Sequence, residues 1–306
     1  MRLPTRANKP VNSSNLHVFL MYMVKLLQCF AHGFLCFLFL VRVTFNSYCT
    51  PIKNSPFVFT TFLSSIEHVP LPDQLNDPFE HRPHPLCVIA AQELQEYLKN
   101  QTEWHHNFGL EDGLHGTIVG KMFGVLVVKN EMNEVGYLSA YSGKLAGGYH
   151  QSRFVPPVFD GLHKGSFLNV GMTELTRINE QIELLQEMHE ESNEEAISLL
   201  KEARKSQSNQ LHAKLYDSFI FLNRSGEKKS LREIFTSPHY KNPPAGAGEC
   251  SAPKLLQYAY LNNLIPIAVA EFWWGQSPKT DTWKHGEYYP ACKEKCKPIL
   301  GFMLST

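Results

Sequence analysis

The sequence predicts an α+β fold in three layers, with a long helical or coiled-coil arm inserted into it. Residues 122–129 and 135–142 are two apolar runs, and the short polar connection between them is typical of a β-hairpin. Residues 265–275 form a third apolar run, which indicates a buried strand. Residues 172–215 carry isoleucine and leucine at spacings of three and four, as in a long amphipathic helix or a helical hairpin.

We expect four parts along the chain. An apolar N-terminal segment and a proline-rich entry cover residues 1–85, and the first half of an α/β domain covers residues 86–171. The helical arm covers residues 172–215, and the second half of the domain, with a cysteine cluster, covers residues 216–306. A polar arm with an apolar seam is suited to pairing with another chain, so we expect self-association through residues 172–215.

Shorter patterns place helices next to the strands. Residues 90–100 repeat apolar side chains at a helical period, which predicts a helix with one buried stripe. Residues 254–262 are expected to form a helix that follows Cys250 and ends at two asparagines. Ser230, with Glu233 three residues later, has the signature of a capping box at a helix start.

The composition is that of a folded protein whose charges balance. Of the 306 residues 43% are apolar, and 29 basic residues match 29 acidic ones. Zero net charge excludes a whole-molecule attraction to nucleic acid, so any RNA contact must use a local patch. The seven cysteines are an odd number in a long chain and do not form the pattern of a disulfide framework. This predicts a reducing, cytoplasmic location.

An apolar run at residues 26–41 leaves membrane anchoring open. It follows four basic residues, which is the charge order of a signal anchor, but its sixteen residues are short for a membrane span. Two other interpretations remain. The run is either a buried or partner-bound apolar helix, or an upstream extension produced by a wrongly chosen start codon.

The residues most suited to chemistry lie near the C-terminus, within residues 245–303. Glycines precede Glu249 and Cys250, and Pro253 suits the first turn of the helix expected next. Cys250 is therefore expected near a helix N-terminus. There the helix dipole lowers the pKa of a thiol and favours the thiolate that a metal requires.

Cys292 and Cys296 are expected on one face of a last helix, because residues four apart lie on the same side of an α-helix. With Cys250 they would supply three thiolate ligands to zinc, leaving the fourth position to water, Glu249 or His285. The alternative is three reduced thiols in the core, because cysteine is often buried for packing alone. The sequence leaves both interpretations open.

The order helix, strand, strand, helix, strand and cysteine-pair helix resembles the zinc-dependent nucleobase deaminases. The resemblance implies a three-layer deaminase-like α/β arrangement, with zinc as cofactor and a nucleobase as substrate. In that family a glutamate two residues after the first ligand transfers protons, but here Ala252 stands there and Glu249 precedes Cys250. The cysteine pair is also separated by three residues instead of two. Glu249 is therefore expected to be a displaced catalytic acid/base.

Longer segments resemble the N-terminal region of bacterial RluA-type pseudouridine synthases. They are GKMFGVLVV, GYLSAYSGKLAG, FVPPVFD, GAGECSAPKLLQYAYLNNLIPIAVAEFWWG and YYPACKEKCKPILGFML. The resemblance covers roughly residues 83–303, with the helical arm matching only in character. In such proteins a synthase domain follows this region and isomerises uridine in structured RNA without a metal. The His-Arg-Leu-Asp motif of that domain is absent here, so the resemblance supplies no catalytic residue.

The expected function is that of an accessory, non-catalytic region of an RluA-type pseudouridine synthase, which positions ribosomal or transfer RNA or docks a partner. The first alternative is a zinc-dependent deaminase-like hydrolase acting on a nucleobase. The second alternative is a coiled-coil interaction protein.

Overall fold

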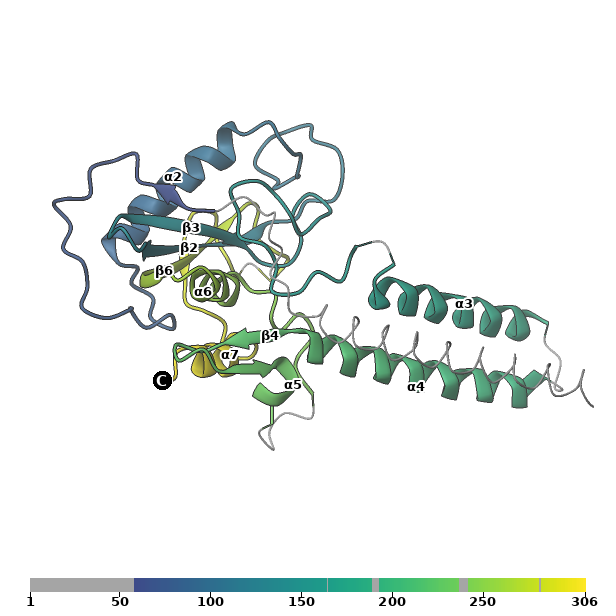
Figure 1. Cartoon of the computed structure of the whole chain (residues 1–306). Helices are drawn as coiled ribbons and strands as arrows, with labels where there is room; N and C mark the ends of the chain where they lie inside the picture. The colour runs from purple at the N-terminus through teal and green to yellow at the C-terminus, as the bar shows by residue number, and fades with distance from the viewer. Residues whose placement is uncertain (1–57, 164, 189–192, 237–241, 281) are drawn as a thin grey trace, which may run out of the picture. The chain divides into compact units, whose positions relative to one another are not determined.

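A five-stranded antiparallel sheet forms the centre of the computed structural model (Figure 1). The structure describes residues 58–163, 165–188, 193–236, 242–280 and 282–306. The strand order is β1-β3-β2-β6-β7, so β2 lies in the middle, between β3 and β6. The strands are β1 (Thr60–Thr61), β2 (Lys121–Lys129), β3 (Val135–Tyr141), β6 (Ile265–Trp274) and β7 (Tyr288–Tyr289).

β2 and β3 form the hairpin that the sequence predicts. In the connection, the Asn130 side-chain oxygen accepts hydrogen bonds from the backbone N–H groups of Met132 and Glu134, at 3.0 and 2.9 Å. Asn133 adopts a φ of 62°, the left-handed conformation that asparagine tolerates. The asparagines of the connection therefore close the turn and fix the register of the two strands.

Helices cover both faces of the sheet. α2 (Pro85–Asn100) packs on one face, against β2 and β6. α6 (Ser251–Leu261) packs on the other face, and α7 (Cys296–Met303) packs against α6 (Figure 1). Successive side chains of β2 enter the two cores alternately: Phe123, Val125 and Val127 lie in the α2 core, and Leu126 and Val128 lie in the α6 core.

The predicted α+β class is confirmed in this general form, and both helices that pack on the sheet, α2 and α6, begin earlier than predicted. The helix expected at residues 90–100 begins at Pro85. His84 caps it, because its Nδ1 accepts a hydrogen bond from the Leu86 N–H at 3.2 Å. Proline suits the first helical position, where its missing N–H has no partner to lose.

A small hairpin and a short helix extend the α6 core. β4 (Ile220–Leu222) pairs with β5 (Lys228–Ser230), and α5 (Leu231–Ile234) follows directly. The capping box predicted for this helix is confirmed. The Glu233 N–H donates to the Ser230 Oγ, and the Ser230 N–H donates to the Glu233 carboxylate.

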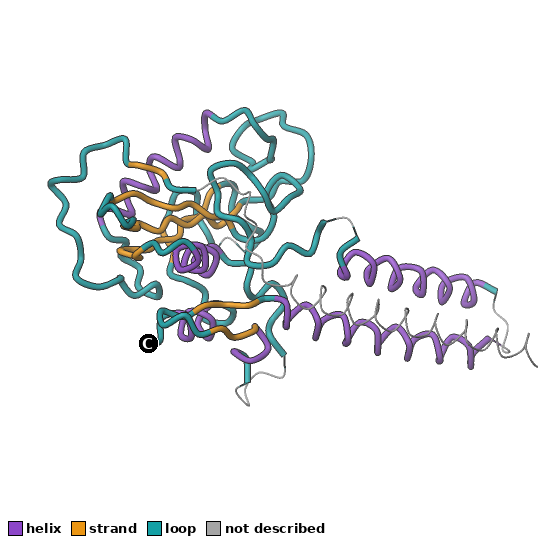
Figure 2. The backbone as a smooth tube through the Cα atoms, viewed as in Figure 1, coloured by secondary structure: helices purple, strands orange, loops and turns teal. Residues whose placement is uncertain are grey.

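Two helices, α3 (Phe167–Glu187) and α4 (Glu194–Ser218), pack against each other and form the arm (Figure 2). The arm thus begins earlier and ends later than the predicted range, residues 172–215. Gly171 allows the close approach, because a Cβ atom there would lie 2.6 Å from the Leu211 Cδ1. Coiled-coil geometry and self-association through this arm stay predictions.

The proline-rich segment before α2 is hydrogen-bonded to the sheet and to the turn that carries Cys292. Asn76 exchanges two hydrogen bonds with the backbone of Val269 on β6, at 3.0 and 2.8 Å. The Ala291 N–H donates to the Pro78 carbonyl at 2.8 Å. This segment therefore lies between the edge of the sheet and the turn that leads into α7.

The apolar run at residues 26–41 lies outside the described residues, so its three interpretations stay predictions. Within the part of the chain that the structure describes, none of the helices combines the length and the apolar character needed to cross a membrane.

Gly124 lies where α6 approaches β2, and its replacement tests that contact. A Cβ atom on Gly124 would lie 2.9 Å from the Cβ of Ser251, in the first turn of α6. We expect Gly124→Ala to lower the free energy of unfolding by about 1–3 kcal/mol, as overpacking typically does. Denaturant-induced unfolding measures the change.

The matched control is Gly301→Ala, because a Cβ atom at this position in α7 meets nothing within 4 Å. Alanine favours a helix over glycine, so this variant should be neutral or more stable by up to about 1 kcal/mol. Equal stability of the Gly124→Ala variant and the unaltered protein would contradict the close contact.

Candidate functional site

The first part of the site is the start of α6, where Cys250 is the N-cap residue. Gly246 and Gly248 adopt φ angles of 74° and 89°, which turn the chain toward the helix. Gly248 is also required by packing, because a Cβ atom there would lie 2.8 Å from the Phe219 Cδ1. The Cys250 carbonyl accepts a hydrogen bond from the Lys254 N–H, and its thiol makes no capping bond. Cys250 is thus at the helix N-terminus, as predicted. The lowered thiol pKa expected at this position is wrong, because the hydrogen bond with Cys292 raises the pKa of Cys250.

The second part is the turn that leads into α7. The Cys296 N–H donates to the Cys292 carbonyl at 3.1 Å. The Lys295 N–H donates to the Cys292 Sγ at 3.3 Å. The prediction that both cysteines lie on one face of a helix needs correction, because Cys292 precedes α7 and only Cys296 belongs to it. The Lys295 N–H donates its hydrogen bond to the Cys292 sulfur and not to a backbone carbonyl, as it would inside a helix.

The three cysteines predicted as zinc ligands come together, and none of them forms a disulfide. Their thiols lie close enough for hydrogen bonds between them to change one another's pKa. The hydrogen bond with Cys250 lowers the pKa of the Cys292 thiol, and the same contact raises the pKa of Cys250 to about 12. Contacts with both partners, together with burial, raise the pKa of Cys296. Cys292, the exposed member, therefore ionises most readily.

The three cysteines are of a residue type that suits zinc, because thiolates are preferred zinc ligands. Three thiolates would leave the fourth position of a tetrahedral site to water or another group. Among the described residues, no group of three or more His, Cys, Asp or Glu side chains is already arranged around a metal position. The three thiols instead contact one another. Zinc binding would require them to lose their protons and to separate around the ion.

Glu271 is a buried carboxylate of the site that the sequence analysis missed. It lies on β6, between Gly124 of β2 and Tyr289 of β7. Its Oε1 accepts hydrogen bonds from the Ser251 Oγ and, at 3.1 Å, from the Ala252 N–H. Burial raises the pKa of this carboxyl group, and hydrogen bonds from the start of α6 oppose the rise. The available signal was one carboxylate inside an otherwise apolar strand.

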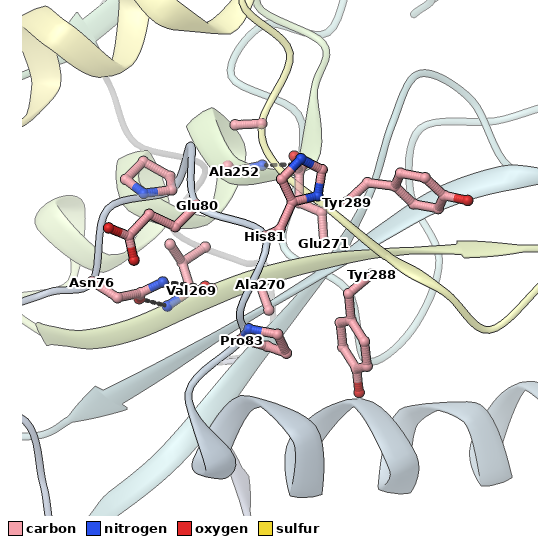
Figure 3. Close-up of a pocket in the computed structure, with 12 residues that line it drawn as sticks. Asn76, Glu80, His81, Pro83, Ala252, Val269, Ala270, Glu271, Tyr288 and Tyr289 are labelled. Carbon is pink, nitrogen blue, oxygen red and sulfur yellow. Dashed lines mark hydrogen bonds between the residues drawn. The ribbon is translucent and has the colours of Figure 1, made fainter. Parts of the chain in front are cut away.

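A small cavity adjoins Glu271 (Figure 3). Its volume of about 10 Å³ is close to the room that one water molecule needs. Ala252 of α6 and Ala291, which precedes Cys292, line it together with His81 and Tyr288. The cavity therefore lies next to the two backbone segments that carry the thiols.

Glu249, the predicted acid/base, belongs to a different polar group. The Tyr149 hydroxyl donates to the Glu249 Oε1 at 2.7 Å. The buried Lys254 Nζ donates to the carbonyls of Tyr141 and Gly143, at 2.9 and 3.2 Å. Burial lowers the pKa of Lys254 to about 8, and the charge of Glu249 opposes this shift. Glu249 thus acts as a counter-charge here, and its role as acid/base stays a prediction.

His285, the predicted fourth ligand, packs with the core on the other face of the sheet. Its Nδ1 accepts a hydrogen bond from the Gly275 N–H at 3.1 Å, and its ring centroid lies 4.3 Å from that of Trp274. Trp274 belongs to the α2 core, whereas Cys296 belongs to the α6 core. The contacts of His285 therefore do not join it to the thiols.

The chain matches no protein-family model, no curated protein and no solved structure among those with which it was compared.

The buried Lys254 predicts a pH dependence of stability. Its pKa is about 8 in the folded protein against an ordinary value of 10.5, so in this window the unfolded chain binds more protons than the folded one. Proton linkage then raises the free energy of unfolding as pH increases from about 8 to 10.5. We expect Lys254→Met to remove most of this increase.

Denaturant-induced unfolding of both proteins across that pH window measures the effect. Other groups titrate in both proteins, so the difference between their pH slopes isolates Lys254. Equal slopes would show that Lys254 keeps its proton in the folded state throughout the window.

Proposed function

We propose that this chain is a zinc-binding accessory region that acts in RNA modification, in the manner of the N-terminal region of RluA-type pseudouridine synthases. The observation that carries the zinc site is the meeting of three free thiols beside two helix starts. Zinc held by Cys250, Cys292 and Cys296 would cross-link the start of α6 to the turn before α7 and stabilise the fold. The region would position ribosomal or transfer RNA or dock a partner.

The segments that resemble the synthase region support this proposal, because they lie together in the fold. GKMFGVLVV and GYLSAYSGKLAG hold β2 and β3, and GAGECSAPKLLQYAYLNNLIPIAVAEFWWG holds α6 and β6. YYPACKEKCKPILGFML holds β7, α7 and the cysteine pair. The resemblance thus falls on the sheet and on the thiol cluster, and not on the arm.

A basic patch beside the thiols supplies a place for RNA phosphates. It consists of Lys293, Lys295 and Lys297, of which the first and last are exposed. In the described part of the chain none of the three forms a salt bridge. Lys229 and Arg232, by contrast, pair with neighbouring carboxylates. The patch beside the thiols therefore keeps more of its positive charge for a phosphate backbone.

Metal analysis tests the zinc site. We expect about one zinc per chain in the purified protein, and loss of most of it in Cys292→Ser, because removing one thiolate opens the site. Cys87→Ala is the control, because this buried cysteine lies in the α2 core and should leave the zinc content unchanged.

Two results would contradict this prediction. A content below about one zinc per three chains in the unaltered protein would remove the metal from the proposal. Full zinc content in Cys292→Ser would remove Cys292 from the ligand set.

RNA binding tests the rest of the proposal. We expect replacement of Lys293, Lys295 and Lys297 by glutamine to weaken transfer RNA binding. The slope of log K against log salt should fall in magnitude by about 2–3, if each lysine contacts one phosphate. Fluorescence anisotropy over a range of salt concentrations measures both quantities.

The charge-matched control replaces three basic residues of α4, Lys201, Arg204 and Lys205, by glutamine. An equal loss of RNA affinity in this control would contradict a specific role of the basic patch. RNA would then bind through the arm or through the net charge of the protein. Undetectable binding of the unaltered protein to transfer and ribosomal RNA would overturn RNA positioning.

A second candidate function is a zinc-dependent, deaminase-like hydrolase acting on a nucleobase. Glu271 favours it, because its carboxylate accepts a hydrogen bond from the N–H of Ala252. Position 252 is where the deaminase pattern would have its proton-transferring glutamate. The order of the strands, with β2 between β3 and β6, is compatible with the deaminase-like arrangement expected from the sequence.

A further inference from the structure

The two helices of the arm carry the same short sequence pattern. Residues 180–188 read EQIELLQEM and residues 195–203 read EAISLLKEA, with glutamate, isoleucine, two leucines and glutamate at matching positions. The first segment lies at the end of α3 and the second at the start of α4, and the two helices pack side by side (Figure 2). The arm is therefore built from two similar halves.

The contacts between the helices place Leu184 beside Leu199. The Arg204 Nη1 donates to the Asn179 Oδ1 at 2.6 Å, so these two positions lie opposite each other. In an antiparallel pair, a step forward along one helix matches a step back along the other. Leu184 is five residues after Asn179, and Leu199 is five residues before Arg204, so the two leucines also lie opposite each other.

The repeated pattern divides its apolar side chains between the seam of the arm and an exposed side. Ile182 is buried, and the matching Ile197 is half-buried. Leu184 and Leu199 are instead 62% and 61% exposed. Matching positions of two antiparallel helices that share a seam lie on the same side of the pair. The two leucines therefore form one exposed patch.

The exposed patch continues along α3. Met188 follows Leu184 by four residues, and Val170 precedes Met188 by eighteen residues, which is five helical turns. Both side chains are more than half exposed. A groove of about 540 Å³ lies beside Val170 and reaches Gln207 of α4. One side of the arm thus offers apolar side chains and a groove over about 27 Å.

On α4, the same side carries small residues that leave room for another helix. Ala196 and Ala203 lie three residues before and four residues after Leu199, and both are exposed. Alanine side chains let a neighbouring helix come close. We call this side of the arm the open face. It consists of Val170, Leu184, Met188, Ala196, Leu199 and Ala203.

Glutamates border the open face on its two outer edges. The repeated pattern places one glutamate four residues before and another three residues after each leucine of the patch. The isoleucine of each helix is two and five residues away from them, so they lie on the side away from the seam. All four are exposed, and within the described residues none forms a salt bridge. They are Glu180, Glu187, Glu195 and Glu202.

These charges determine which helix fits the open face. A helix that packs on two others places apolar residues in the centre and flanking residues against the neighbouring helices. Here the flanking residues meet the four glutamates, so lysine or arginine is favoured, and glutamate or a phosphate is repelled. A second copy of the open face would bring glutamates against glutamates, which disfavours self-association through this face.

We propose that the open face is the docking site of a basic amphipathic helix from a partner protein. The partner helix completes a three-helix coiled coil with α3 and α4. The inference rests on the docking part of the proposed function and gives it a surface and a class of partner. It uses neither the three thiols nor the basic patch beside them.

Two synthetic peptides of about 18 residues test the class of partner, because five turns match the length of the open face. Both carry leucine at the coiled-coil positions a and d. One peptide carries lysine at e and g, and the other carries glutamate there. We expect the whole chain to bind the glutamate peptide at least about 10-fold more weakly, because attractive contacts at the edges become repulsive. Fluorescence anisotropy of labelled peptides measures both affinities.

Replacement of the two leucines tests the surface. Leu184→Asn combined with Leu199→Asn should weaken binding of the lysine peptide at least about 10-fold, because two apolar side chains are no longer buried in the complex. Both positions are exposed, so this variant should fold as the unaltered protein does. The matched control is Met172→Asn. Met172 is 53% exposed but lies two residues from Val170, about 200° around the helix, and should leave the affinity unchanged.

Replacement of all four edge glutamates by lysine tests the charge argument. This variant should bind the glutamate peptide more tightly than the lysine peptide. Three results overturn the inference: equal affinity of the unaltered protein for the two peptides, binding of neither peptide, and full affinity in the leucine variant. An equal loss in Met172→Asn would also overturn it, because binding would then not depend on the open face.

Sedimentation of the protein tests the competing occupant. A dimer that becomes a monomer in the leucine variant would assign the open face to a second copy of this chain and overturn the inference. The leucine variant should keep its zinc content and its affinity for transfer RNA, so failure of peptide binding alone leaves those parts of the proposed function intact. Absence of zinc or of RNA binding in the unaltered protein would defeat those parts and leave the result on docking valid.

Discussion

The contact between Glu271 and the first turn of α6 determines where the rest of the site lies. A carboxylate in the middle of a sheet is unfavourable unless polar groups solvate it, and the first N–H groups of a helix do so with the help of the helix dipole. The Ser251 Oγ and the Ala252 N–H fill this role. Gly124 lets the helix come close enough. Cys250, one residue before this turn, is thereby held beside the turn that carries Cys292.

A buried charge of the opposite sign lies one turn further along α6. The Lys254 Nζ donates hydrogen bonds to two carbonyls, one at the end of β3 and one just after it. Buried charges of this kind add little net stability, but a buried charge that loses its partners is strongly destabilising. The two sets of contacts therefore favour the observed position of α6 on β2 and β3.

The sequence predicts the helices and strands of this fold better than it predicts the contacts between them. The hairpin of β2 and β3, the strand β6 and the capped α5 follow from local patterns of apolar and turn residues, which act over a few positions. Cys250 at a helix start was predictable for the same reason. The approach of Glu271 to Ala252 was not, because it joins residues nineteen apart. It depends on Gly124, which carries no such signal in the sequence.

The three cysteines differ in burial, so they contribute differently to the packing of the core when no metal is bound. Cys296 is fully buried among apolar side chains, so a polar replacement there would damage the core itself. Cys250 is partly buried at the edge of the same core, and its thiol accepts no hydrogen bond from the N–H groups at the start of α6. Cys292 is exposed and contributes little to packing. Packing alone therefore explains Cys296 but gives no reason for a thiol at Cys292, whereas the proposed zinc site would give one.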